Sequence, residues 1–448
     1  MPEINEIFFI EIDGLGHSGE GVGHLDGYAV FVDGALPGER VEVRLIERKK
    51  RYGRAQLIKV HKASKERSEP PCSVFGKCGG CQLMHLSYEK QLEVKTRRVI
   101  DALTRIGQIA DPPVAACIGS DLSLAYRNKI QIPVREGAHG AALGLYARAS
   151  HHLVEVESCH IHCSLGEEVY QKAQDCIKKA SIAAYDPITE AGELRHLLIK
   201  TAMRSQEVLV ILITNQTPSP ALFSLARALM VSHPAVKGVV HNLQSGRGNV
   251  ILGSVYTVLE GQGTIQEKLF DMTFSISPAS FFQINPGQAE RLYSRAIEYA
   301  DLGEGATVVD AYCGVGTLSL CFARSAKQVI GIECIQEAVE DARANALANH
   351  IHNAVFTCAH AEDFMRTLVD VDVVLLNPPR KGCERLVLSE VERLQPKTVI
   401  YISCDPTTLA RDSAHLITGG YTLDAVQPYD MFPQTAHVEC VAKFSLRT

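Results

Sequence analysis

The chain has 448 residues, a formal net charge of −6 at pH 7 and 46% hydrophobic residues. This length predicts two or three domains, and the composition is typical of a globular protein rather than a disordered or collagen-like one. Apolar runs are too short for a membrane span and residues 1–6 lack a basic region followed by an apolar stretch, so we expect a cytoplasmic protein without a membrane partner.

Residues 1–63 contain short alternating runs with glycines at positions 14, 16, 19, 21 and 23, a pattern that predicts a small β-barrel. Residues 44–67 hold ten lysines or arginines against two glutamates. A charge run of this kind is usually a solvated face. On a small barrel it also suits the backbone of a nucleic acid, and we favour that interpretation although the net charge is negative.

Residues 64–263 form a second region, in which alternating runs at 128–134, 197–202 and 208–214 predict an antiparallel sheet, with 141–150 as a linker. Its glycine-rich loop carries Cys72, Cys78 and Cys81, and either Cys159 or Cys163 can supply a fourth thiol. Because the expected compartment is reducing, these are thiols or metal ligands rather than disulfides. Four thiolates suit a 4Fe-4S cluster or zinc, and the spacing of five then two residues is unlike the paired Cys-x2-Cys sites of structural zinc.

Residues 264–448 alternate strands and helices and predict a doubly wound α/β fold with two closing strands at an antiparallel edge. A helix should begin at Pro286 with Asn285 as its N-cap. The expected strands are 307–312, 328–333, 354–358, 371–376, 397–402, 421–427 and 438–445, and the expected helices are 317–325, 336–349, 384–394 and 406–418.

The first two of these strands predict a nucleoside cofactor. Strand 307–312 runs into Cys313-Gly314-Val315-Gly316, where a cofactor can approach the backbone at the start of a helix. Glu333 ends the next strand and is placed to bind ribose hydroxyls. The position of a third glycine holds Ser319, which favours S-adenosylmethionine over NAD.

Two residues near the carboxyl end suggest carbon methylation. Cys404 follows a buried strand, at the edge where open α/β sheets place their ligands. Methylation of an electron-poor ring carbon needs a thiolate to attack the ring and a base to remove a proton afterwards, and Cys404 and Glu439 are the candidates. Taken alone, in a chain with 14 cysteines, Cys404 is better interpreted as a packed core cysteine, and the surrounding motifs favour the catalytic interpretation.

Taken together, these motifs resemble the bacterial RNA uridine C5-methyltransferases, in the iron–sulfur branch that modifies 23S ribosomal RNA. The matching segments are the TRAM-like barrel, the Cys72–Cys81 loop, residues 277–283, the glycine strand, residues 377–382 and residues 403–407. The resemblance implies a class I (Rossmann-like) methyltransferase domain at 264–448, a TRAM/OB-like barrel at 1–63 and a central α+β domain at 64–263 with the iron–sulfur loop.

The resemblance also assigns residues. It implies Cys404 as the nucleophile, Glu439 as the base, and Gln283, Tyr312 and Glu333 as contacts of S-adenosylmethionine. It favours Cys159 over Cys163 as the fourth ligand of a 4Fe-4S cluster, beside Cys72, Cys78 and Cys81. We expect a monomer that acts on 23S ribosomal RNA. The alternatives are a transfer RNA uridine C5-methyltransferase and an RNA-binding paralogue with weakened catalysis.

Asn377 departs from this family, in which most relatives have aspartate before the two prolines. The position is expected beside the cofactor's amino group or the substrate base. An amide accepts a hydrogen bond as a carboxylate does, but it also donates one and carries no charge. The geometry of the site can therefore persist while the affinity changes. Arg380, in place of an aromatic residue, argues against methylation of an amino group.

Overall fold

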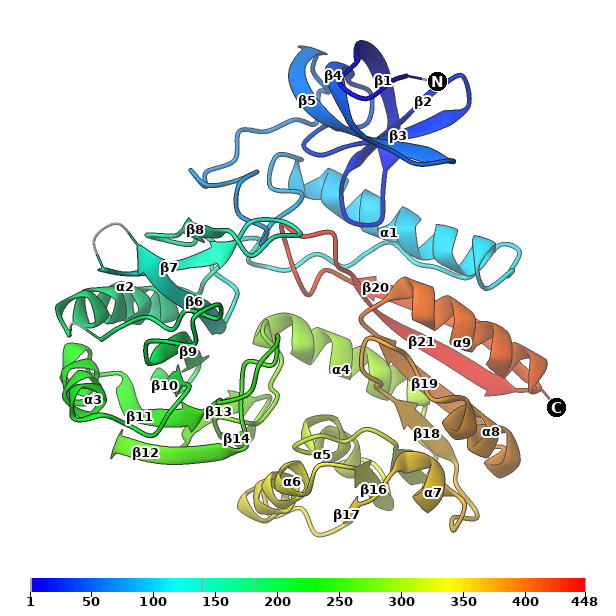
Figure 1. Ribbon diagram of the computed structural model, residues 1–448. Coiled ribbons are helices and arrows are strands. Elements are labelled where there is room, and N and C mark those ends of the chain that lie inside the picture. The colour runs from blue at the N-terminus through cyan, green and yellow to red at the C-terminus, as the bar shows by residue number, and fades with distance from the viewer. Residues whose placement is uncertain (1, 138–139, 181, 448) are drawn as a thin grey trace.

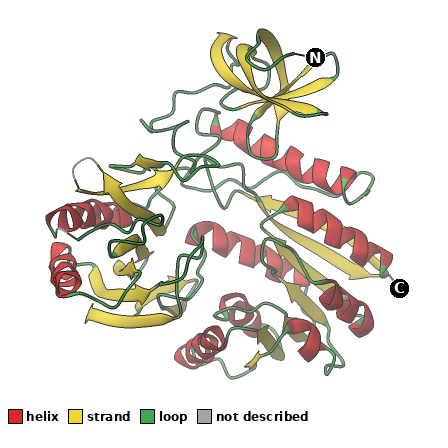
Figure 2. Ribbon diagram, in the orientation of Figure 1, coloured by secondary structure: helices red, strands yellow, loops and turns green. Residues whose placement is uncertain are grey.

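The computed structural model describes residues 2–137, 140–180 and 182–447. A closed barrel, a mixed sheet and a doubly wound sheet are arranged around the long helix α1 (Tyr88–Arg105). In Figure 1 the barrel lies above α1, and the doubly wound sheet with its helices lies below it. Figure 2 shows that the barrel is built from strands and loops, whereas the other two bodies combine strands with helices.

The predicted barrel is confirmed, with the strand order β1-β2-β3-β5-β4. Its strands are β1 (Ile7–Leu15), β2 (Gly21–Leu25), β3 (Tyr28–Val32), β4 (Arg40–Arg48) and β5 (Tyr52–Lys62). Along β4 the apolar residues Val41, Val43 and Leu45 are fully buried in the barrel. The alternation of a strand then directs Arg44 and Arg48 outward, so the basic stretch lies on the outer surface.

The central body is a seven-stranded sheet of order β12-β11-β10-β9-β6-β7-β8. Its strands are β6 (Lys129–Gly137), β7 (Gly140–Tyr146), β8 (Leu153–Glu155), β9 (Leu194–Ala202), β10 (Glu207–Thr214), β11 (Val236–Leu243) and β12 (Val255–Gly261). Helices α2 (Ser164–Lys179) and α3 (Pro220–Ser232) cover one face, and the hairpin of β13 (Ile265–Leu269) and β14 (Met272–Ile276) packs on the other.

Two expectations for this central body are wrong. The sheet is mixed rather than antiparallel, because β10 and β11 pair in parallel across the connection made by α3. Residues 141–150 are not a linker, since most of them form β7, which pairs with both β6 and β8. Ala141, Leu143 and Leu145 of this segment alternate along the strand and pack in the core that includes α2.

The doubly wound sheet has the predicted topology, with the order β17-β16-β15-β18-β19-β21-β20 and an antiparallel edge formed by β21 and β20. Its strands are β15 (Thr307–Asp310), β16 (Gln328–Glu333), β17 (Ala354–Cys358), β18 (Val373–Leu376), β19 (Thr398–Ser403), β20 (Tyr421–Tyr429) and β21 (Glu439–Leu446). Strands β18 and β19 are almost wholly apolar because helices cover both of their faces.

The helices of this domain divide between the two faces of the sheet. Helices α4 (Pro286–Ala300), α5 (Thr317–Ala323) and α6 (Gln336–Ala348) pack on one face. Helices α7 (Ala361–Met365), α8 (Arg385–Leu394) and α9 (Pro406–Thr418) pack on the other. Val99 and Leu103 of α1 are fully buried in that second core, so α1 is attached to the methyltransferase-like sheet. The predicted N-cap of α4 is confirmed, since the Asn285 side chain accepts a hydrogen bond from the Gln288 N–H.

Candidate active site

The carboxyl edge of the parallel strands gathers most of the predicted site residues. Tyr312 follows β15 after one residue, Glu333 ends β16, Asn377 follows β18 and Cys404 follows β19. These four strands are consecutive neighbours in the sheet, so the residues lie along one edge. That edge is where open α/β sheets bind their ligands.

Glu439 joins this edge from the antiparallel strand. Ser403 of β19 pairs with Cys440 of β21, and continuing the register by one residue places Cys404 opposite Glu439. Side chains that face each other across an antiparallel pair lie on the same side of the sheet. The two residues therefore meet although they are 35 positions apart in sequence, which brings the candidate nucleophile and the candidate base together.

The electrostatics of this pair are set by burial and by one arginine. Burial raises the pKa of the Cys404 thiol to about 11; the Glu439 carboxylate adds to this rise, and the Arg380 guanidinium opposes it. Burial also raises the pKa of Glu439 to about 7, again opposed by Arg380. Arg380 thus favours both the thiolate and the carboxylate, the charged forms that nucleophilic attack and proton removal require.

Glu439 is buried and keeps one carboxylate oxygen unpartnered within the described residues. Its side chain is 5% exposed, and its Oε2 atom has no hydrogen-bond partner among the described residues. A buried carboxylate oxygen without a partner is costly, and such groups occur at sites where a ligand supplies the missing contact. With a pKa near neutrality this carboxylate can act as a general base.

The Glu333 carboxylate lies against the glycine turn that follows β15. The Gly314 N–H donates to Glu333 Oε2 at 3.2 Å, which fixes the carboxylate against the turn. At the start of α5, Gly316 has a φ of +81°, and a Cβ there would meet the Phe356 ring at 3.0 Å. Glycine is therefore required for the backbone to enter the helix at this point.

Gln283 reaches the same neighbourhood from the loop that precedes α4. It is buried, and its backbone carbonyl accepts a hydrogen bond from Asn128 Nδ2 at 3.0 Å. The fully buried Tyr293 hydroxyl interacts with the Gln283 side chain and is electrostatically coupled to Glu439. Asn377, by contrast, has no hydrogen-bond partner among the described residues, although its side chain is half-buried.

Cys404 opens into a cleft of about 270 Å³ to which the barrel, the central region and the sheet all contribute. Its lining comprises His17, Ser18, Gln82, Arg98, Arg148, Arg380, Cys404, Asp405, Ala436 and His437. Three arginines line the cleft, a residue type suited to phosphates; Arg380 acts on the thiol, whereas Arg148 is paired with Glu20 and Asp33. The sequence did not indicate Arg98, Arg148 or His17, since they come from distant segments; it did single out Arg380, which follows the end of β18, but not its action on Cys404 and Glu439.

Three of the four predicted ligand cysteines lie at one apolar cluster. Cys72, Cys81 and Cys159 pack against the same buried core. After burial, mutual repulsion of Cys78, Cys81 and Cys159 contributes to their raised pKa values, so the thiols are close enough to interact. Among the described residues, no three of these side chains converge at the spacing of metal ligands.

Burial raises the pKa of Cys78 and Cys159, and backbone donors partly oppose this rise. The Gly80 N–H donates to Cys78 Sγ at 3.3 Å, and the N–H groups of Ile161 and His162 favour the Cys159 thiolate. Hydrogen bonds of this kind to ligand sulfurs tune iron–sulfur clusters. Cys163 differs: it is 2% exposed and interacts with Gly166 and Thr201 in the central body, apart from the other four.

Comparison with known proteins identifies the family. The family model for tRNA (uracil-5-)-methyltransferase matches residues 255–445, and that for the TRAM domain matches residues 3–58. An uncharacterised RNA methyltransferase of Clostridium acetobutylicum is 40% identical over 98% of this chain and 96% of its own length. One from Bacillus cereus is 39% identical over 99% of this chain and 98% of its own length.

A solved structure extends the similarity to the fold. The tRNA (uracil-54, C5)-methyltransferase of Pyrococcus abyssi, in complex with S-adenosyl-L-homocysteine, superposes with a TM-score of 0.77 and 27% identity, covering 98% of this chain and 100% of that one. None of the helices in the described ranges is long and apolar enough to cross a membrane. The chain therefore belongs to the RNA (uracil-5-)-methyltransferase family and is an enzyme with an amino-terminal TRAM domain.

Proposed function

We propose that the protein transfers a methyl group from S-adenosylmethionine to C5 of a uridine in RNA, with Cys404 as nucleophile and Glu439 as base. The meeting of these two residues across β19 and β21, beside a cofactor cradle, carries the proposal. The similar Pyrococcus abyssi enzyme was crystallised with S-adenosyl-L-homocysteine, which supports the choice of cofactor.

The proposed reaction uses both side chains in turn. The target uridine leaves its stack and enters the cleft. The Cys404 thiolate forms a bond to C6, and the electron pair of the C5–C6 double bond makes C5 nucleophilic. S-adenosylmethionine supplies the methyl group as an electrophile and leaves as the neutral thioether. Glu439 then takes the C5 proton, and the C6–sulfur bond breaks to restore the double bond and the thiolate.

The cofactor contacts follow from the edge of the sheet. Its position at the end of β16 supports Glu333 as the partner of the ribose hydroxyls, and Gln283 and Asn377 would supply amides to the base and the amino acid part of the cofactor. Tyr312 is half-buried, and its ring packs against the core beneath α8. We propose these four residues as the cofactor site, within the domain 264–448; residues 1–63 and 64–263 would serve RNA binding and the cysteine cluster.

For the substrate we propose 23S ribosomal RNA, bound by the exposed basic face of the barrel and by the arginines of the cleft. Transfer RNA is the alternative. The similarity to the Pyrococcus abyssi tRNA enzyme favours this alternative. Because that similarity covers 98% of this chain, the presence of a barrel does not exclude transfer RNA as the substrate. Mass-spectrometric mapping of 5-methyluridine in both RNAs, from cells with and without the gene, decides between them. If cells without the gene keep 5-methyluridine in both RNAs, the proposal is contradicted.

We further propose that Cys72, Cys78, Cys81 and Cys159 hold a 4Fe-4S cluster. Thiolate is the donor type that such a cluster takes, Cys72, Cys81 and Cys159 lie at one apolar cluster, and backbone N–H groups favour the thiolates of Cys78 and Cys159, although these side chains do not stand at ligand spacing among the described residues. When bound, the cluster would cross-link the cysteine loop. A redox role is not needed, because methyl transfer through a thiolate adduct has no redox step. We expect a structural or RNA-positioning role.

The cluster proposal predicts about four irons per chain after anaerobic purification. Cys159→Ser should lose most of this iron, because it removes a ligand. Cys163→Ser is the matched control and should keep the iron, since Cys163 interacts with Thr201 instead. Iron content and visible absorbance are measured for both variants. Stoichiometric zinc without iron, or iron loss only in Cys163→Ser, would overturn the assignment.

Asn377→Asp tests the departure from the family. A carboxylate should pair with the ammonium group of S-adenosylmethionine more strongly than an amide, because charge-assisted hydrogen bonds are roughly twice as strong as neutral ones. We expect several-fold tighter cofactor binding in calorimetry, with 5-methyluridine formation preserved. A wild-type protein that leaves uridine unmodified, whether or not aspartate restores methylation, would instead mean that Asn377 marks weakened catalysis.

A further inference from the structure

Residues 430–438 connect β20 to β21 and lead directly into Glu439; we call them the catalytic segment. The segment contains no helix or strand, yet it is largely buried: Asp430 and Met431 are fully buried, and Gln434 is 6% exposed. Gln434 has a φ of +70°, a left-handed conformation that is unfavourable for a side chain other than glycine. Such a conformation persists where the surroundings determine it.

Helix α1 presents a stripe of polar side chains to this segment. Gln91, Lys95 and Arg98 follow the i, i+4, i+7 spacing that places residues on one helical face. Lys95 Nζ lies 2.5 Å from Asp430 Oδ1 and 3.2 Å from the Phe432 carbonyl oxygen. Arg98 donates to the Ala436 carbonyl. Three successive turns of α1 thus each contact the catalytic segment.

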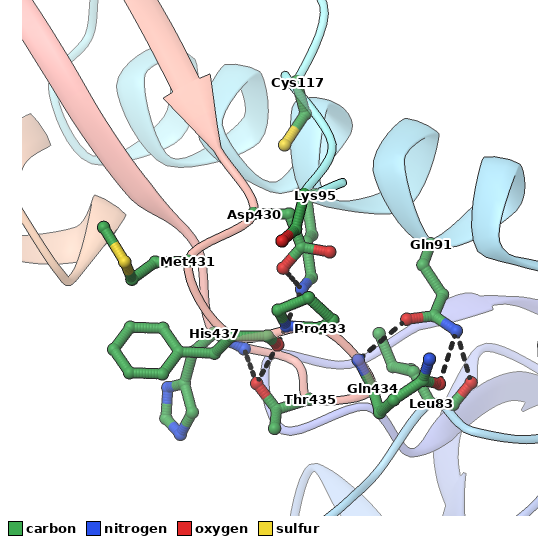
Figure 3. A network of polar contacts seen from close by, with 12 residues as sticks. Leu83, Gln91, Lys95, Cys117, Asp430, Met431, Pro433, Gln434, Thr435 and His437 are labelled. Atoms are coloured by element: carbon green, nitrogen blue, oxygen red, sulfur yellow. Dashed lines mark hydrogen bonds and ion pairs between the residues drawn. The ribbon is translucent and has the colours of Figure 1, made fainter. Parts of the chain in front are cut away.

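Gln91 makes the most complete set of contacts, as Figure 3 shows. Its Oε1 accepts from the Gln434 N–H at 3.1 Å, and its Nε2 donates to Gln434 Oε1 at 3.0 Å. The same Nε2 donates to the carbonyls of Leu83 and Leu86. One buried amide therefore joins the strained residue of the catalytic segment to the loop that follows Cys81.

That loop holds the catalytic segment from its other side. The N–H groups of Gln82 and Leu83 both donate to the Gln434 carbonyl, at 3.0 and 2.9 Å. Gln82 Oε1 accepts from the Ala436 N–H at 3.3 Å. Gln434 is consequently fixed through its N–H, its carbonyl and its side chain, three residues before His437 and five before Glu439.

The Lys95–Asp430 pair points to geometry rather than stability as the purpose of these contacts. Both side chains are at most 1% exposed, and Asp430 Oδ2 has no partner within the described residues. A buried ion pair seldom stabilises a fold more than apolar residues of the same size would, whereas it does require one arrangement of the groups that hold it. Here that arrangement fixes the course of the chain as it leads into β21.

We propose that Gln91 and Lys95 are positioning residues that fix the catalytic segment so that Glu439 meets the C5 proton of the substrate. This inference rests on the proposed function, in which Glu439 is the base. It predicts that weakening the contacts slows proton removal while leaving the attack of Cys404 unaffected, because Cys404 is held by β19 and the start of α9 instead.

Gln91→Met is the test, because methionine keeps the length of glutamine and loses its hydrogen bonds. We expect tritium release from 5-tritiated uridine RNA to fall about ten- to a hundredfold, as misplacement of a catalytic group by an ångström can cause. The methylated covalent adduct should accumulate. The rate of capture by 5-fluorouridine RNA and the KM for S-adenosylmethionine should stay within about twofold of the wild-type values.

Gln244→Met is the matched control. Gln244 is also a buried glutamine whose amide both donates and accepts, to Val250 and from Gly246, but it lies in the central body away from the site. It should keep wild-type tritium release. If Gln91→Met does not fold, the double variant Lys95→Met/Asp430→Leu removes the ion pair without leaving a lone charge and should give the same accumulation of adduct.

The outcomes separate this inference from the proposed function. A parallel decrease of capture and tritium release in Gln91→Met would show a merely structural role and overturn the inference, as would wild-type tritium release. Glu439→Gln is measured beside it. Normal product release by Glu439→Gln would refute the base itself, whereas adduct in Glu439→Gln with wild-type behaviour in Gln91→Met would refute only the positioning.

Discussion

Cys404→Ala is expected to lower methylation of uridine by roughly 10⁴-fold or more, because the side chain that activates C5 is removed and no other group replaces it. The half-buried thiol opens into the cleft, and the register of β19 and β21 places it beside Glu439. The alanine variant should also fail to form a covalent complex with RNA that carries 5-fluorouridine, a base whose C5 has no proton to remove and which therefore traps the wild-type enzyme.

The measurement is a denaturing gel that separates free from captured RNA, together with methyl incorporation located to the base. Cys176→Ala is the matched control, since Cys176 is a half-buried thiol on α2, outside the site. It should give wild-type capture. Unchanged turnover of Cys404→Ala would end its assignment as the nucleophile, and residual methylation with lost capture would indicate a pathway without a covalent adduct.

Much of the methyltransferase domain could be predicted because its signals are local. The apolar strands, the glycine turn after β15 and the Asn285-Pro286 helix start are each specified by a few adjacent residues, and their order predicts the parallel sheet. Strand ends moved by one to a few residues. The five-residue helix α7 was not predicted, because so short a segment has no complete amphipathic repeat.

The central body was harder to predict because its pairing is not local. The parallel pair of β10 and β11 depends on how α3 crosses the sheet, which no pattern within either strand reveals. Helix α1 was missed as well. Its polar residues Gln91, Lys95 and Arg98 break the expected apolar stripe, because they contact a segment more than 330 residues later in the chain, with separations of 343, 335 and 338.

The candidate site likewise combines residues that local motifs indicate with contacts that depend on the fold. Sequence motifs indicated Cys404, Glu333 and the cysteine loop, since each follows or ends a recognisable element. The proximity of Cys404 and Glu439 was inferred from chemistry, and the register of two strands now supplies its physical basis. The influence of Arg380 on both groups required the fold, because it depends on the neighbouring end of β18.

Glu439→Gln is the complementary prediction, since it should stop the reaction after methyl transfer rather than before it. Removal of a general base slows its step by about 10²- to 10⁴-fold, so the methylated covalent RNA adduct should accumulate with natural uridine RNA.

In the wild type, burial raises the pKa of Glu439 to about 7. Because only the ionised carboxylate accepts a proton, resolution of the adduct should slow about tenfold per pH unit below that value and level off above it. The glutamine variant should show no such dependence. Quenched-flow gels and mass spectrometry of the adduct across this pH range measure both effects, and rapid adduct resolution by the glutamine variant would show that another group removes the proton.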